Sequence, residues 1–152
     1  MVLHPEVLQK AQAEIDRVVG GTRLPNVDDR ASLPYVDCII KEVYRAMTQD
    51  SAMYPEPETF RPERFQEMDN YTAEQADPRK FILGFGRRYD DAISICPGRH
   101  FADVTIWLTV ASIIAAFDIS KARDAGGNEI IPRMSFTSGL VRSVGSFGLF
   151  GC

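Results

Sequence analysis

The spacing of apolar residues predicts two helices near the start of the chain. Residues 5–19 repeat apolar side chains every three or four positions, as an amphipathic helix does, at Leu8, Ala11, Ile15, Val18 and Val19. Residues 34–45 show the same spacing, with Ser32 as a candidate N-cap and an apolar face formed by Val36, Ile39, Ile40 and Val43. Cys38 lies beside this face, where a buried cysteine acts as a small hydrophobic residue.

A third helix is predicted over roughly residues 99–117, the most apolar part of the chain. The apolar run from Val104 to Phe117 is 14 residues long and is bounded by Asp103 and Asp118. A membrane span needs about 20 apolar residues. We therefore expect a buried helix and no membrane span, with its most buried side chains at Trp107, Leu108, Ala111 and Ile114.

Between and after these helices the sequence is irregular. Three prolines within residues 50–65 forbid a regular helix, and aromatic rings are expected to pin this segment over a core, at Tyr54, Phe60 and Phe65. Residues 66–80 are polar and indicate a loop or a short helix. A glycine-rich turn near residue 126 precedes short strand-like pieces in residues 129–144. The predicted fold class is mainly α with a few short β-strands.

Length and composition narrow the class of protein. The 152 residues suffice for one domain, and 45% hydrophobic with 25% charged residues is ordinary for a globular chain. The net charge of −4, without a basic block, argues against nucleic acid as a partner. Three cysteines and two histidines argue against a disulfide framework and a zinc centre. The N-terminus lacks the pattern of a secretory signal peptide.

Cys96 has the most suggestive surroundings of the three cysteines. It precedes Pro97, Gly98 and the predicted third helix, whose N-terminal dipole favours a thiolate. These local features leave three possibilities open: an inert structural cysteine, a metal ligand, or a nucleophile with His100 as its base. Glu42 and Arg45 form a second polar feature, which by itself indicates only an ion pair on a helix.

Three motifs, taken in order, resemble the C-terminal part of the cytochrome P450 family, the haem-thiolate monooxygenases. Glu42-x-x-Arg45 resembles the E-x-x-R helix, and Pro62-Glu63-Arg64-Phe65 resembles the segment that ends in P-E-R-F. The family's cysteine-ligand loop has two halves, which residues 85–88 and residues 96–99 of this chain resemble. The resemblance covers residues 4–144, has the general appearance of the fungal microsomal members, and leaves residues 145–152 as a divergent tail. Residues 1–152 are therefore interpreted as a single, partial and incomplete domain of that fold.

The resemblance implies a site for haem b. Cys96 takes the position of the axial iron ligand, whose electron density favours O–O cleavage. Arg88 takes that of the residue that contacts a haem propionate, and the ligand loop also includes Phe85, Gly86 and Gly98. Glu42, Arg45 and Arg64 take the positions of a structural charge triad that locks the core near the haem. The implied reaction inserts one oxygen atom of dioxygen into a small organic substrate, with electrons from an NADPH-dependent reductase.

Several departures accompany the resemblance. Six residues, Tyr89–Ser94, are inserted before the ligand, and a block is missing between Arg45 and Ala46. The family's proton-delivering pair has no counterpart here, so no catalytic residue is expected in these 152 residues, and the chain alone is not expected to be active. Members of this type are usually anchored in the endoplasmic reticulum, but the anchor is absent here, which leaves the location of this chain open. The alternative interpretation is a non-catalytic fragment or pseudoenzyme with weak or no haem binding; an unrelated thiol enzyme that uses Cys96 ranks below both.

Overall fold

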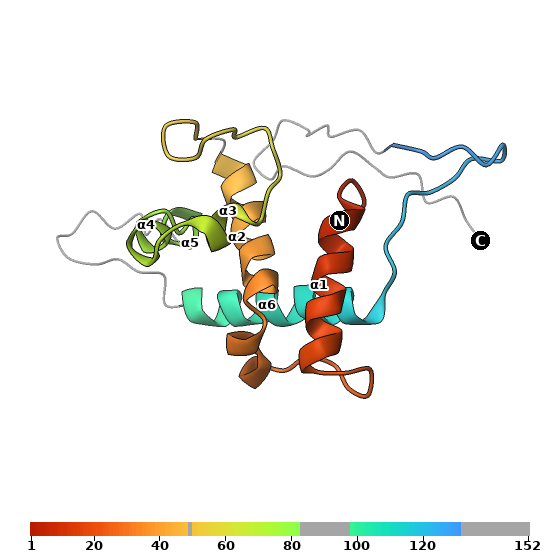
Figure 1. Cartoon of the computed structure of the whole chain (residues 1–152), viewed down its shortest axis with the longest axis horizontal. Helices are drawn as coiled ribbons and strands as arrows, with labels where there is room; N and C mark the ends of the chain where they lie inside the picture. The colour runs from red at the N-terminus through yellow and green to blue at the C-terminus, as the bar shows by residue number, and fades with distance from the viewer. Residues whose placement is uncertain (49, 83–97, 132–152) are drawn as a thin grey trace.

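Three long helices contain most of the helical residues of the structure, a computed structural model that describes residues 1–48, 50–82 and 98–131. Helix α1 spans Pro5–Val18, α2 spans Pro34–Thr48 and α6 spans Arg99–Ala116. Helix α6 runs across both α1 and α2 and packs against each of them (Figure 1). All three helices lie where the apolar spacing predicts them.

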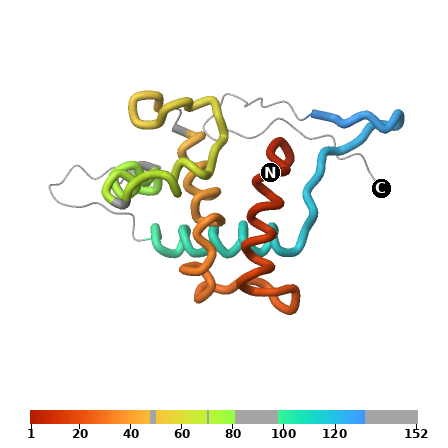
Figure 2. Tube along the Cα trace, in the orientation of Figure 1, coloured from red at the N-terminus to blue at the C-terminus, as the bar shows by residue number. Residues whose placement is uncertain are grey.

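Shorter helices complete the described part of the chain. A 3-10 helix, η1, spans Val27–Ser32, and three short α-helices follow α2: α3 at Arg64–Glu67, α4 at Asn70–Gln75 and α5 at Arg79–Ile82. These three lie on the side of α2 away from α1 (Figure 2). Asp69 caps α4, since its carboxylate accepts a hydrogen bond from the amide of Thr72 at 3.0 Å.

The core lies where α1, α2 and α6 meet. Trp107 and Ala111 of α6 are almost fully buried there. Leu108 was expected to be equally buried, but it is only partly buried at the edge of this cluster. The buried apolar side chains of the cluster are Val7, Leu8, Ala11, Ile15, Leu33, Tyr35, Val36, Ile39, Ile40, Tyr44, Trp107, Ala111 and Ile114.

The proline-rich segment is pinned by its aromatic rings, as predicted. Tyr54 and Phe65 are buried with Cys38 and Ala76 in a second apolar cluster. The Tyr54 hydroxyl donates a hydrogen bond to the carbonyl of Ala76 at 2.7 Å, which closes the segment over residues 66–80. Burial raises the pKa of the Cys38 thiol to about 11, so this cysteine is the inert buried residue that its position predicts.

Two details of α2 differ from the sequence prediction. The amides of Tyr35 and Val36, in its first turn, donate to the carboxylate of Glu14 on α1 at 3.0 Å and 3.3 Å. The expected cap, Ser32, instead ends η1 two residues earlier. Val43 is 47% exposed although it lies on the predicted apolar stripe. In this second half of α2, the side chains that contact the proline-rich segment are the charged ones, Glu42 and Arg45.

The fold is mainly α, as predicted. Within the described residues, β structure amounts to one antiparallel bridge between Arg123 and Glu129, and the strand-like pieces expected after residue 131 lie outside those residues. Helix α6 is apolar along most of its length, yet Phe101, Ile113 and the following Phe117 are exposed. No helix within residues 1–48, 50–82 and 98–131 is both long enough and apolar enough to cross a membrane.

Candidate functional site

A buried charge cluster joins α2 to α3. Glu42 accepts a hydrogen bond from Arg45, with 2.9 Å between Oε1 and Nη2. Its other oxygen, Oε2, lies 3.0 Å from Nε of Arg64. The three side chains are 0%, 1% and 6% exposed, respectively. The structure thus brings together all three members of the expected charge triad.

The two arginines of this cluster also hold the proline-rich segment. Arg64 donates to the carbonyl oxygens of Pro55 at 2.6 Å and Thr59 at 2.9 Å, and Arg45 donates to that of Pro57. The backbone amide of Arg61 donates to Glu42 at 2.8 Å. One buried carboxylate therefore faces two guanidinium groups, and backbone carbonyls accept further hydrogen bonds from the Nη atoms of both. This arrangement is what a buried charge group requires.

The predicted haem ligand lies between two described elements. Cys96, Arg88, Phe85 and Gly86, with the Tyr89–Ser94 insert, lie outside the described residues. Gly98 is described: it is the N-cap of α6, with an ordinary helical backbone at φ −80°. The sequence thus runs from α5 through the candidate ligand into the first turn of α6. His100, the alternative base partner, is exposed in that turn.

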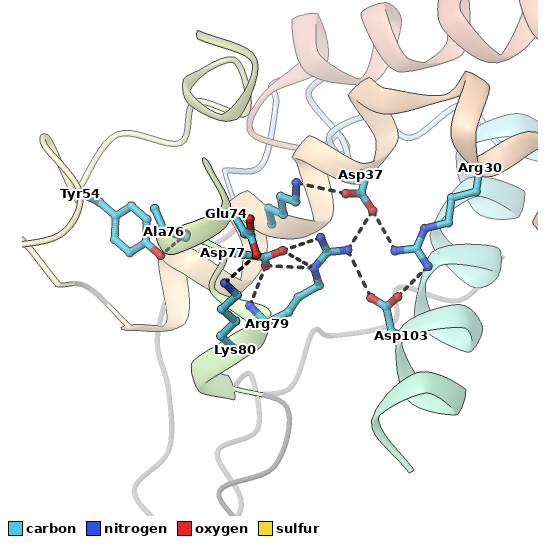
Figure 3. Close-up of polar contacts among 10 residues, drawn as sticks. Arg30, Asp37, Tyr54, Glu74, Ala76, Asp77, Arg79, Lys80 and Asp103 are labelled. Carbon is cyan, nitrogen blue, oxygen red and sulfur yellow. Dashed lines mark hydrogen bonds and ion pairs between the residues drawn. The ribbon is translucent and has the colours of Figure 1, made fainter. Parts of the chain in front are cut away.

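A second set of charged side chains lies at α5 and the first turns of α6. Sequence reasoning missed this set. Asp37 of α2 accepts from Arg30 at 2.9 Å and from Arg79 at 3.2 Å (Figure 3). Asp103 of α6 pairs with the same two arginines, at 2.6 Å and 3.5 Å. We call these four side chains, Arg30, Asp37, Arg79 and Asp103, the charge ring. Lys41 lies outside the ring and pairs with Asp37 at i,i+4, the spacing that helix geometry makes visible in a sequence, whereas no helical spacing relates the four ring members.

Nearby positive charges lower the pKa values of Asp37 and Asp77. Burial by itself raises the pKa of Asp37, but Arg79, Arg30 and Lys41 outweigh it, and the pKa lies below its ordinary value. Burial also raises the pKa of Asp77, yet its hydrogen bonds with Arg79 lower it overall. Arg79 holds Asp77 through several N–H groups, at 2.6–3.0 Å. The pKa of Arg79 is correspondingly raised, despite its burial.

Comparison with known proteins identifies the family. The model of the family described as Cytochrome P450 matches residues 1–48 and 44–142, nearly the whole chain. The chain belongs to the cytochrome P450 family. It is 44% identical to cytochrome P450 monooxygenase 176 of Postia placenta and 39% identical to cytochrome P450 monooxygenase claT of Ampulloclitocybe clavipes. A zebrafish cytochrome P450 solved with abiraterone shares the fold, with a TM-score of 0.70 and 23% identity over 95% of this chain and 38% of that one.

The chain spans about a third of the length of these curated P450 relatives. The alignments cover 97% and 93% of this chain but 34% and 35% of the relatives. The first alignment runs over 182 positions, against 152 residues in this chain, so at least 30 positions of the relative have no counterpart here. The two ranges that match the family model overlap at residues 44–48. This overlap includes Arg45, after which a block is expected to be missing. The contact between Glu42 and Arg64 forms across this junction.

The sequence offers one donor of the kind that haem iron takes. A bare metal ion needs several protein ligands, and among the described residues no group of three His, Cys, Asp or Glu side chains could hold one. Haem iron takes as little as one axial ligand from the protein, and a cysteine thiolate is one of the known choices. Cys96, directly before Pro97 and the α6 cap at Gly98, is a candidate of that kind.

Proposed function

We propose that this chain carries the cysteine-ligand part of a haem-thiolate monooxygenase. The observation that supports this most is the buried contact of Arg64 with Glu42. Two segments that each resemble a P450 motif meet there at 3.0 Å, so the chain keeps the part of the family core that supports the ligand segment. In this proposal residues 4–144 form one partial domain, and residues 145–152 are a divergent tail.

The proposal gives the residues of the ligand segment distinct roles. Cys96 binds the iron as a thiolate, and Arg88 pairs with a haem propionate. Phe85, Gly86 and Gly98 complete the loop around the ligand. When bound, haem supplies the dioxygen chemistry of the family. Glu42, Arg45 and Arg64 do not touch it; they fix the helix and the loop on which the site rests.

The full-length activity that we propose is the insertion of one oxygen atom into a small organic substrate, with electrons from an NADPH-dependent reductase. The 152 residues by themselves are not expected to perform it. They span about a third of the length of the curated relatives. A haem held only from the cysteine side would leave its other face open to water.

A specific feature favours weak haem binding as the alternative. The insert Tyr89–Ser94 lengthens the connection between Arg88 and Cys96 and brings in Asp90 and Asp91. A longer loop adds a modest entropic cost of closure. Added negative charge near the sulfur also disfavours its thiolate form. Deleting residues 89–94 should therefore strengthen haem binding.

Haem reconstitution tests the proposal. The chain is titrated with haem, reduced and exposed to carbon monoxide, because thiolate ligation gives a strongly red-shifted Soret band and imidazole ligation does not. Cys96→Ser should abolish that band, whereas Cys38→Ser and Cys152→Ser should retain it. A band that survives Cys96→Ser would overturn the ligand assignment. No band from either the chain or its 89–94 deletion would favour the non-catalytic fragment.

A further inference from the structure

The segment that carries Cys96 has two described stems. One is α5, whose Arg79 lies four residues before the segment, and the other is the first turns of α6, which include Asp103. Nη1 of Arg79 lies 3.5 Å from Oδ1 of Asp103, so an ion pair directly connects the stems. Figure 3 shows the two side chains pointing toward one another from their separate helices.

The charge ring also connects the two stems indirectly, through Asp37 of α2. Arg79 and Arg30 share Asp37 on one side, and the same two arginines share Asp103 on the other. Each of the four charges therefore has two opposite charges as neighbours. Their side chains are 17–22% exposed, so water screens them less than it screens fully exposed pairs.

The first stem depends on these contacts. Helix α5 is only four residues long, and a helix of that length is not stable on its own in water. Asp77 fixes the Arg79 guanidinium beside α5, and Asp37 then attaches it to α2. The second stem is attached to η1 and α2 through Arg30, which also lies over the ring of Trp107 at 5.8 Å. Substitution of either Arg79 in the first stem or Asp103 in the second should therefore loosen both stems.

We propose that Arg79 and Asp103 are positioning residues for the haem ligand, because the charge ring fixes the separation of the two stems from which Cys96 and Arg88 must reach one haem. This inference rests on the proposed function. It differs from a general role in stability, because it requires the ion pair between the stems and not simply the presence of charges around Asp37. Lys41 provides the matched control: it pairs with the same Asp37 at 3.3 Å, within α2, and not across the contact between Arg79 and Asp103.

The first experiment needs no haem. Hydrogen–deuterium exchange is measured on the full chain and on Arg79→Gln, Asp103→Asn and Lys41→Gln. The substitution on either stem should raise amide exchange in both residues 79–82 and residues 99–103, and Lys41→Gln should raise it in neither. Faster exchange confined to the substituted element, or no change at all, would overturn the proposal.

The second experiment measures the ligand. Residues that orient a metal ligand typically change metal affinity about 10- to 100-fold, so Asp103→Asn and Arg79→Gln should weaken haem binding in that range. At saturating haem, they should also lower the fraction of the carbon monoxide complex with the red-shifted band, and Asp103→Glu should restore part of it. Lys41→Gln should match the unaltered chain. Far-UV circular dichroism verifies that each variant keeps its helices.

The two experiments separate this inference from the proposed function. If the unaltered chain gives no red-shifted band, the proposed function fails and the exchange measurement alone decides whether the ring couples the stems. If the chain gives the band and the stem variants give it equally at equal haem affinity, the positioning role is wrong while the proposed function stands.

Discussion

Replacing Glu42 by glutamine is the sharpest perturbation of the buried charge cluster. The substitution keeps the size and shape of the side chain but removes the charge that faces two arginines. Nη2 of Arg45 lies 2.9 Å from Oε1, and Nε of Arg64 lies 3.0 Å from Oε2. The glutamine amide also presents N–H groups toward one of these cations. Both guanidinium groups would then remain buried without the negative charge that Glu42 supplies.

The burial of Glu42 sets the expected loss in the free energy of unfolding. Removing one partner of a buried ion pair costs about 3–5 kcal/mol, since the other charge stays desolvated. The 0% exposure of Glu42 places it in this class. Domains of ordinary stability have a free energy of unfolding of about 5–15 kcal/mol, so the loss is a large share of the total. With a urea m-value of about 2 kcal/mol/M, the midpoint should fall by about 2 M.

Urea unfolding followed by far-UV circular dichroism measures this shift. The control is Arg23→Gln, which removes a still shorter pair, 2.6 Å to Asp29, whose arginine is 46% exposed, and should move the midpoint much less. Arg64→Lys keeps the charge but loses the fork that reaches the carbonyls of Pro55 and Thr59, so it should give an intermediate loss. If Glu42→Gln shifts the midpoint no further than Arg23→Gln, the cluster does not stabilise the fold.

Three further predictions follow from burial and charge. Ile114→Ala should cost about 2–4 kcal/mol of unfolding free energy, and the neighbouring Ile113→Ala much less, because the two side chains are 1% and 41% exposed; equal losses would contradict the packing of α6. Because folding lowers the pKa of Asp37, its ion pairs contribute fully to the free energy of unfolding above its ordinary pKa. This contribution is lost as the pH falls through the pKa that Asp37 has in the folded chain. Asp37→Asn should therefore reduce the loss of stability as the pH falls below about 4, and an unchanged pH profile would argue against its ion pairs. Cys38, with a pKa of about 11, should escape alkylation by iodoacetamide at pH 8 in the folded chain and react in urea, as peptide mass spectrometry would show; rapid labelling of the folded chain would contradict its burial.

Local sequence signals predicted the helices well. The stripe of Leu8, Ala11 and Ile15 is buried as its spacing requires, and the apolar run from Val104 forms α6. Such signals act over three or four residues, and they are present in the chain before any tertiary contact forms. The proline-rich segment was predicted for the same reason, because proline restricts its own backbone wherever it lies.

The contacts that fix the site depend on residues far apart in the sequence. Glu14 caps α2 from another helix, and Arg30 meets Asp103 across 73 positions. No spacing rule connects such residues, so the charge ring could not be predicted from the sequence alone. The contact of Arg64 with Glu42 is equally long-range in kind, yet it could be predicted, because the family resemblance supplied the pairing. Val43 shows the converse: a local stripe fails where charged partners, and not apolar ones, cover the neighbouring face.

The identity of the iron ligand is the central claim, and X-ray absorption at the iron edge tests it most directly. The haem-reconstituted chain should show one sulfur neighbour at the iron. That sulfur should be lost in Cys96→Ser and retained in Cys38→Ser and Cys152→Ser. An iron with only nitrogen and oxygen neighbours in the unaltered chain, or a sulfur neighbour that persists in Cys96→Ser, would contradict the assignment of Cys96.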